Sequence, residues 1–354
     1  MSDVLRVKFK LGLFDHPFID PQLDAKVSRA PEHLAVSQRS AEESMCLLKN
    51  DRQTLPLAKT LQNIAVIGPN GDVARLGDYA DQGADKEWSI VDGIKSVLPN
   101  ANVIIAAMGE RLGISGEGFD RENLDLPDNQ EALLEALVAT GKPVVLVLEN
   151  GRPLSITWAA DHVPAILEAW YPGELGGIAV AKTLFGDNNP AGRLPVSFPR
   201  SVGQIPDFYN HESSSRTKDY VEGTSPPLFT FGTGLSYTTF KYDQLSITAS
   251  AGGSKNDVQI SVNITNTGKL EGDEVAEVYI RQEVADVVTP VESLKAFHRL
   301  HLKSGETKTV MFSIPQADLA VWNANKHWAI EPGNFDVKVG SSLDGALNGG
   351  FTLK

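Results

Sequence analysis

The pattern of apolar and polar residues changes once along the chain, near residue 240. Upstream of this point, short apolar runs alternate with segments whose apolar residues recur every three or four positions, as on one face of a helix. We expect strands at 63–68, 101–108, 144–148 and 165–170, and helices at 31–50, 90–98, 130–140 and 175–185. Strands that alternate with helices predict an α/β sandwich with a mostly parallel sheet covered on both faces.

Downstream of residue 240 the period becomes two. Residues 258–264 alternate strictly between apolar and polar, and 274–281, 307–314 and 334–339 do much the same, with Gly-containing turns between them. This pattern predicts an all-β, fibronectin type III-like sandwich. The expected domains are therefore 30–215 (α/β sandwich), 216–240 (a Ser-, Thr-, Pro- and Gly-rich linker) and 241–354 (β-sandwich). Residues 1–29 precede them, and residues 1–21 are expected to form a helix end with an irregular exit.

The net charge of the chain limits the classes of partner that it is expected to bind. The formal net charge is -13 and the pI about 5.0, so the surface repels nucleic acid and anionic membranes. No apolar run approaches the roughly 20 residues that span a bilayer, and the seven His residues show no metal-ligand spacing. We expect no cofactor, no metal, no nucleic acid and no membrane partner. The single cysteine, Cys46, is expected to be a buried apolar side chain in a helical stretch.

The loop at 109–121 carries the most informative chemistry. It follows a buried strand, so it is expected at the carboxyl edge of the parallel sheet, where α/β folds place their sites. It offers Glu110, Glu117 and Asp120 beside arginines, and glycines on both sides of Glu117 allow a sharp bend. A carboxyl on such a loop is a candidate proton donor for glycoside hydrolysis, which also needs a second, facing carboxylate. The alternative is a solvated, charged loop.

This loop resembles the acid/base loop of glycoside hydrolase family 3, of the β-glucosidase and β-xylosidase type. Further segments resemble the same family in order: EESMCLLKND at 42–51, IAVIGP at 64–69, GKPVVLVL at 141–148, NGRPL at 150–154, AILEAWYPG at 165–173, LFGDNNPAGRLPVSFPR at 184–200, SVGQIP at 201–206, FGTGLSYTTF at 231–240 and LKAF at 294–297. The resemblance covers essentially the whole chain.

The resemblance implies a retaining β-glycosidase that hydrolyses terminal β-linked sugars from oligosaccharides or glycosides. It implies that Glu117 is the general acid/base and that Glu110 shapes or hydrates the site. By the same resemblance, Asp120 and Arg121 fix the loop. The family's Asp nucleophile lies in a Ser-Asp-Trp-like motif within an N-terminal (β/α) barrel, and no such motif is found here. The chain therefore resembles the C-terminal portion, with 1–29 as the remnant of the barrel-to-sandwich linker and the missing barrel domain or a homo-oligomer as its expected partner.

Other segments of the chain allow more than one interpretation. The Gly-rich turn after 64–68 faintly resembles a dinucleotide-binding loop, but it lacks the required glycine spacing and Pro69 removes an amide. Glu174 and the glycines after it suggest either an anion site or close helix packing. His211 and Glu212 suggest a metal pair or a solvated linker. Residues 102–105 look shortened relative to the family, so a strand and a helix are expected to be missing.

Two questions stay open on sequence alone. Trp88, in a polar loop, is the best candidate for sugar stacking, whereas Trp170 and Trp322 lie in apolar contexts and are expected in the core. The chain is either the acid/base half of a β-glycosidase, inactive without a barrel, or a non-catalytic two-domain protein that binds carbohydrate or a partner. Localisation, periplasmic, secreted or cytoplasmic, is not determined.

Overall fold

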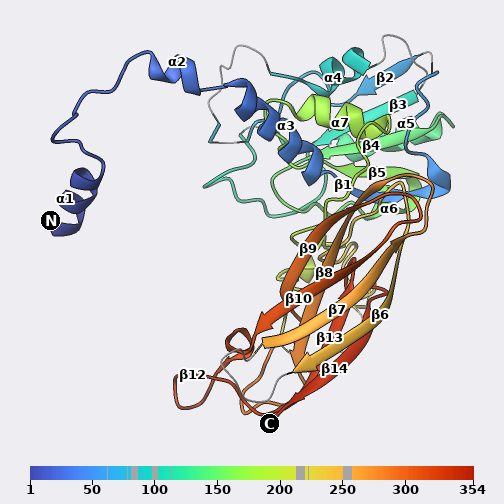
Figure 1. The fold of residues 1–354 in the computed structure, drawn as a ribbon. Coiled ribbons are helices and arrows are strands. Elements are labelled where there is room, and N and C mark those ends of the chain that lie inside the picture. The colour runs from blue at the N-terminus through green and yellow to red at the C-terminus, as the bar shows by residue number, and fades with distance from the viewer. Residues whose placement is uncertain are drawn as a thin grey trace.

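A five-stranded sheet forms the centre of the first half of the chain (Figure 1). The computed structural model describes all residues except 62, 78, 81–86, 98–102, 112, 213–219, 222 and 250–256. The strands are β1 (Cys46–Asn50), β2 (Ile64–Ile67), β3 (Val103–Gly109), β4 (Val144–Glu149) and β5 (Ala165–Glu168), in the order β1-β5-β4-β3-β2. β2 to β5 are parallel, and β1 pairs antiparallel with β5 at one edge.

Helices cover both faces of this sheet, because alternate residues of each strand point to opposite sides. On β4, Val145 and Val147 face one apolar core, while Leu146 and Leu148 face the other. The first core is covered by α3 (Pro31–Ser44), α4 (Ile90–Val97) and α7 (Gly176–Leu184), and the second by α5 (Gln130–Ala139) and α6 (Thr157–His162). The α/β sandwich with a mostly parallel sheet is confirmed.

The predicted helix at 31–50 is wrong in its last part. α3 ends at Ser44, and Cys46 lies in strand β1. The run from Met45 to Leu48 is apolar without interruption, which fits a strand buried on both faces: Leu47 faces one core, and Cys46 and Leu48 face the other. Cys46 is buried, as expected, and burial raises the pKa of its thiol to about 12.

A β-sandwich follows from residue 240. One sheet contains β10 (Thr307–Pro315), β7 (Asp257–Asn266) and β6 (Phe240–Ala249), and the other contains β14 (Leu347–Leu353), β13 (Gly333–Gly340), β8 (Gly272–Gln282) and β9 (Ser293–Leu302). A short hairpin joins β11 (Val321–Trp322) and β12 (Trp328–Ala329). Three 3-10 turns occupy Asp51–Gln53, Val202–Gln204 and Gln316–Leu319. The predicted all-β fold is confirmed.

The N-terminal segment stands apart from both layers in Figure 1. It contains α1 (Ser2–Lys10), in which no residue is buried, and α2 (Leu23–Val27). Apolar side chains that would normally be covered are exposed along it, among them Phe9 and Phe14, whose rings contact each other. None of the helices in the described part of the chain is long and apolar enough to cross a membrane.

The expected shortening at 102–105, with a strand and a helix missing, stays a prediction. Residue 102 lies outside the described residues, and 103–105 belong to β3, between β2 and β4 in the sheet. The glycines after Glu174 serve close packing: a Cβ on Gly177 would lie 1.9 Å from the carbonyl oxygen of Ser89, just before α4. Such a contact requires glycine, so the packing interpretation of this segment fits the structure.

A buried ion pair joins the two domains. Arg193 Nη2 lies 2.7 Å from Glu274 Oε2, with side chains 7% and 1% exposed. Tyr242 donates to the other carboxylate oxygen at 2.6 Å, and Arg193 Nη1 donates to the carbonyl of Gly234 at 2.8 Å. Burial raises the pKa of Glu274, and Arg193 and Tyr242 oppose this by favouring the carboxylate.

We expect Glu274→Ala to lower the free energy of unfolding by about 3–5 kcal/mol, because it leaves the Arg193 guanidinium buried without its partner. Asp243→Ala removes an exposed pair with Lys241 and should cost less than about 1 kcal/mol. Calorimetric melting of both variants checks the difference. Equal shifts in Tm would mean that the buried pair does not stabilise the junction.

Candidate active site

Three carboxyls are buried at the carboxyl edge of the parallel sheet. Glu110 follows β3, and Glu149 and Glu168 are the last residues of β4 and β5. All three are at most 2% exposed. Because β3, β4 and β5 are parallel neighbours, their carboxyl ends meet at the same edge. The predicted position of the 109–121 loop at this edge is therefore correct.

Glu110 is compensated by two arginines. Arg121 Nη1 and Arg152 Nε each lie 3.1 Å from Glu110 Oε1. The backbone N–H of Gly151 donates to Oε2 at 3.3 Å. A carboxylate without solvent exposure is tolerated when charged donors replace its water. Glu110 thus joins the loop after β3 to the turn after β4.

The same arginines hold the loop itself. Arg152 Nη2 donates to the carbonyls of Ile114 and Phe119 at 3.2 and 3.1 Å. Arg121 Nη2 donates to the carbonyl of Asp125 at 2.8 Å. These bonds fix the backbone on both sides of residue 117 while leaving the segment between them outside the core.

Glu117 lies in this held segment and is exposed. Its neighbours Gly116 and Gly118 have backbone φ angles of +116° and +81°, which residues other than glycine rarely adopt. The expected sharp bend is therefore present. The Tyr79 hydroxyl, from the segment after β2, donates to Glu117 Oε2. A carboxyl so presented can exchange a proton with a molecule that approaches the sheet edge.

Glu149 and Glu168 are held differently from Glu110. Burial raises the pKa of Glu149 to about 8, opposed by the charge of Arg75. Its Oε2 has no hydrogen-bond partner among the described residues. Burial also raises the pKa of Glu168 well above the ordinary range, although the backbone N–H of Trp170, at 2.7 Å, and the side-chain amide of Asn150, at 3.1 Å, donate to its carboxyl. Burial thus favours the protonated form of both Glu149 and Glu168.

The structure places the predicted site residues in three ways. It brings Glu110 and Arg121 into direct contact and puts Glu117 at the bend of the same loop. Asp120 is exposed in that loop. Trp88 lies half-buried just before α4, where its backbone N–H donates to the carbonyl of Glu174 at 2.9 Å.

Sequence reasoning missed Arg152, Tyr79 and the two further buried carboxyls, Glu149 and Glu168. Position along the chain could have indicated three of them. Glu149 and Arg152 follow the end of the predicted strand at 144–148, and Glu168 lies in the predicted strand at 165–170. No metal-binding group of three or more His, Cys, Asp or Glu side chains occurs among the described residues. His211 instead contacts the carbonyl of Glu212 through Nδ1 at 2.9 Å.

Comparison with known proteins gives a consistent result. The glycosyl hydrolase family 3 C-terminal domain matches residues 45–237, and a fibronectin type III-like domain matches residues 274–343. A β-xylosidase from Formosa agariphila is 38% identical over 383 residues, which cover 96% of this chain and 53% of that protein. A periplasmic β-glucosidase from Salmonella typhimurium is 36% identical over 417 residues, covering 99% and 54%.

Solved structures agree. A β-glucosidase from Listeria innocua in complex with isofagomine superposes with a TM-score of 0.93 at 29% identity, over 98% of this chain and 54% of that one. The chain spans about half the length of the curated relatives it matches.

We expect Arg152→Ala to release the loop, because it removes one of the two cations at Glu110 and both bonds to the loop carbonyls. Amide hydrogen exchange across 113–121 should accelerate by at least tenfold, on the order of one charged hydrogen bond lost. Arg111→Ala, which removes an exposed contact to Asp128, serves as control. Unchanged protection in Arg152→Ala would show that the loop is held by other contacts.

Stability should fall with rising pH through Glu149. Its pKa is about 8 when folded and near 4.5 otherwise, so between these values the folded protein keeps a proton that the unfolded chain releases. This contribution is fully present below pH 4.5 and is lost as pH rises through 8. The Tm of Glu149→Gln should therefore fall less between pH 5 and 9 than the Tm of the parent. The fall for Glu122→Gln, a change at an exposed position, should match that of the parent. Parallel curves for parent and Glu149→Gln would contradict the assignment.

Proposed function

The chain belongs to glycoside hydrolase family 3, and from this premise we propose that it supplies Glu117 as the general acid/base of a retaining β-glycosidase. The observation that carries the proposal is the placement of Glu117. It lies exposed at a glycine-flanked bend of a loop that two arginines and a buried carboxylate hold at the sheet edge.

The reaction assigns this carboxyl two tasks. As an acid it protonates the glycosidic oxygen while a second carboxylate attacks the anomeric carbon, and as a base it then activates the water that releases the sugar. Retaining enzymes hold the two carboxyls about 5–5.5 Å apart. Glu110, Glu149 and Glu168 are buried, so none of them is presented to a sugar as Glu117 is. Asp120 is exposed in the same loop but lacks the flanking glycines of Glu117.

The second carboxylate is proposed to come from a barrel domain that packs against this chain. The exposed apolar side chains along 1–29 support such a neighbour, because a surface of this kind usually marks an interface. Glu117 would then face the barrel's nucleophile across the bound sugar. A homo-oligomer is the alternative cover for the same surface.

The remaining site residues receive supporting roles. Glu110 and Arg121 position the loop, and Asp120, exposed beside Arg121, is proposed to help shape it. Trp88, just before α4, is proposed to stack on a sugar, since helices that follow parallel strands begin at the same edge as the 109–121 loop. The relatives named β-xylosidase and β-glucosidase suggest terminal β-linked xylosyl or glucosyl units as substrate.

The isolated 354-residue chain should not hydrolyse an aryl β-glucoside or β-xyloside above background, because only one of the two required carboxyls is present by motif. Adding a family 3 barrel in trans should restore turnover. Activity of the pure chain, or a covalent glycosyl adduct on one of its own carboxylates, would overturn this expectation.

In the reconstituted enzyme, Glu117→Ala should slow cleavage of alkyl or other poorly leaving glycosides by about 10²–10⁴-fold, because these need protonation. Aryl glycosides with acidic leaving groups should form the glycosyl-enzyme almost normally, and added azide should rescue the second step as a glycosyl azide. Glu122→Ala is the matched control at an exposed site. If Glu110→Ala gives this pattern and Glu117→Ala does not, the acid/base is Glu110 and the assignment to Glu117 is wrong.

A further inference from the structure

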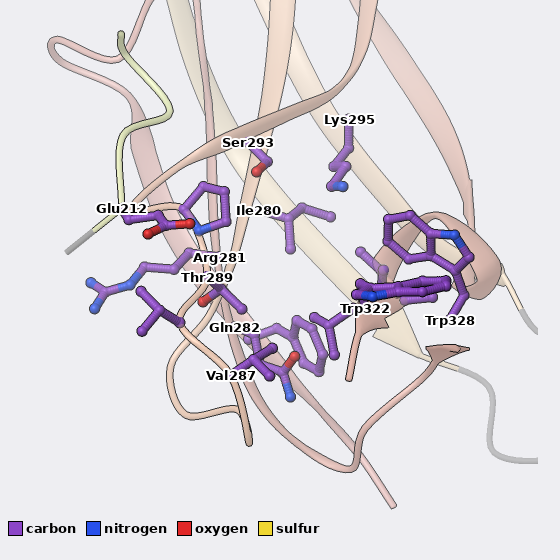
Figure 2. A pocket seen from close by; sticks show the side chains of 16 residues that line it. Glu212, Ile280, Arg281, Gln282, Val287, Thr289, Ser293, Lys295, Trp322 and Trp328 are labelled. Carbon is purple, nitrogen blue, oxygen red and sulfur yellow. The ribbon is translucent and has the colours of Figure 1, made fainter. Parts of the chain in front are cut away.

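A second concave site lies on the β-sandwich. A cavity of about 490 Å³ opens between the end of β8, the start of β9, the loop that joins them and the β11–β12 hairpin. Figure 2 shows the side chains around it. Its volume falls within the range of small-molecule sites, about 300–1,000 Å³. None of the residues that line it belongs to the 109–121 loop.

Two tryptophans form one wall of this cavity. Trp322 and Trp328 are opposite each other in the hairpin, with ring centroids 5.7 Å apart and ring planes at 70°. They are 52% and 67% exposed. This corrects the prediction that Trp322 belongs to the core. Ligand pockets are lined mainly by apolar and aromatic side chains, so this exposed corner beside the cavity is a candidate binding surface.

A buried amide lies in the same cavity lining. Gln282, the last residue of β8, is 6% exposed. Neither its amide nitrogen nor its amide oxygen has a hydrogen-bond partner among the described residues. A buried polar group that lacks a hydrogen bond destabilises the fold. In Figure 2 this side chain lies between Val287 and the two tryptophans. Both polar atoms of the amide are closed to a water-sized molecule in this conformation, so a rotation of the side chain must bring them to a bound hydroxyl, for which the amide can serve as both donor and acceptor.

The charges around the cavity are mixed. Glu212 contributes a negative charge, and Arg281 and Lys295 contribute positive ones. The hydroxyls of Thr289 and Ser293 complete the polar lining. No single sign dominates, so the lining favours a neutral ligand with many hydroxyls over an anion or a cation.

We propose that this cavity binds a neutral pyranose unit of an oligosaccharide, stacked on the Trp322–Trp328 corner and hydrogen-bonded by Gln282. A pyranose ring presents an apolar C–H face and a rim of hydroxyls. The first matches the electron-rich face of an aromatic ring, and the second matches an amide that both donates and accepts. The site is separate from the loop of Glu117, so it does not depend on the proposed catalytic role.

Titration calorimetry of the full 354-residue chain tests this with cellohexaose, xylohexaose and laminarihexaose as probes. At least one of them should bind the parent. Trp328→Ala and Trp322→Ala should each weaken that binding by about tenfold or more, since truncating a tryptophan anchor commonly has effects of this size. Gln282→Leu should weaken binding several-fold without loss of thermal stability, because it removes a buried amide that has no partner.

Phe297→Ala is the matched control, at an aromatic residue of β9 that is 68% exposed and does not line the cavity. It should bind like the parent. Circular dichroism and Tm distinguish loss of binding from loss of folding, and Gln282→Leu provides a folded variant if the tryptophan variants unfold. The proposal is overturned if none of the probes binds, or if binding survives all three cavity variants. It is equally overturned if these variants abolish self-association of the chain without affecting sugar binding.

Discussion

The geometry of the candidate active site depends on the ion pairs that the buried Glu110 carboxylate forms with Arg121 and Arg152. A charge without solvent exposure destabilises the fold by several kcal/mol unless donors surround it. Here the donors come from two segments, Arg121 within the loop after β3 and Arg152 in the turn after β4. The requirement to compensate one charge therefore fixes two loops relative to each other. Glu117 is presented from the backbone that these arginines hold.

The same sheet edge also contains two buried carboxyls that are not compensated by a pair of arginines as Glu110 is. Glu149 and Glu168 are buried without a comparable pair of cations, and burial raises the pKa of both. This edge thus holds a paired carboxylate, two carboxyls that favour the protonated form and the exposed loop carboxyls of Glu117 and Asp120. Perturbed carboxyls clustered at an edge of an α/β sheet are typical of functional sites. The buried groups act on the shape of the edge, whereas Glu117 is exposed at its glycine-flanked bend and is the carboxyl proposed to meet a substrate.

The β-sandwich makes direct non-covalent contacts with the α/β domain, in addition to the covalent connection between them. Arg193 and Glu274 form a buried pair across the junction, and Leu235 of the connecting segment forms a β-bridge with Leu47 of β1. At the far end of β8 from this pair, the sandwich carries the cavity beside Trp322 and Trp328. The strand that anchors the domain through Glu274 thus also supplies Gln282 to that cavity.

Much of the fold could be predicted from the sequence, because burial imposes a period on the chain. Continuous apolar runs revealed the central strands, strict alternation revealed the sandwich, and the glycines around Glu117 indicated a bend that the structure contains. The family motifs added the expected role of Glu117 within that loop. These are local features, and each is visible within about ten neighbouring residues.

What only the tertiary structure decided involves residues that are distant in sequence. The segment at 46–50 became a strand because β5 was available to pair with it, although the residues before it continue a helix. Trp322 is exposed because its hairpin lies at the rim of the sandwich, despite apolar neighbours along the chain. Arg152 reaches Glu110 across 42 positions. The sequence determined which groups are charged, apolar or flexible, whereas the order of the parallel strands determined which of them meet, because their ends converge at one edge only after the sheet has formed.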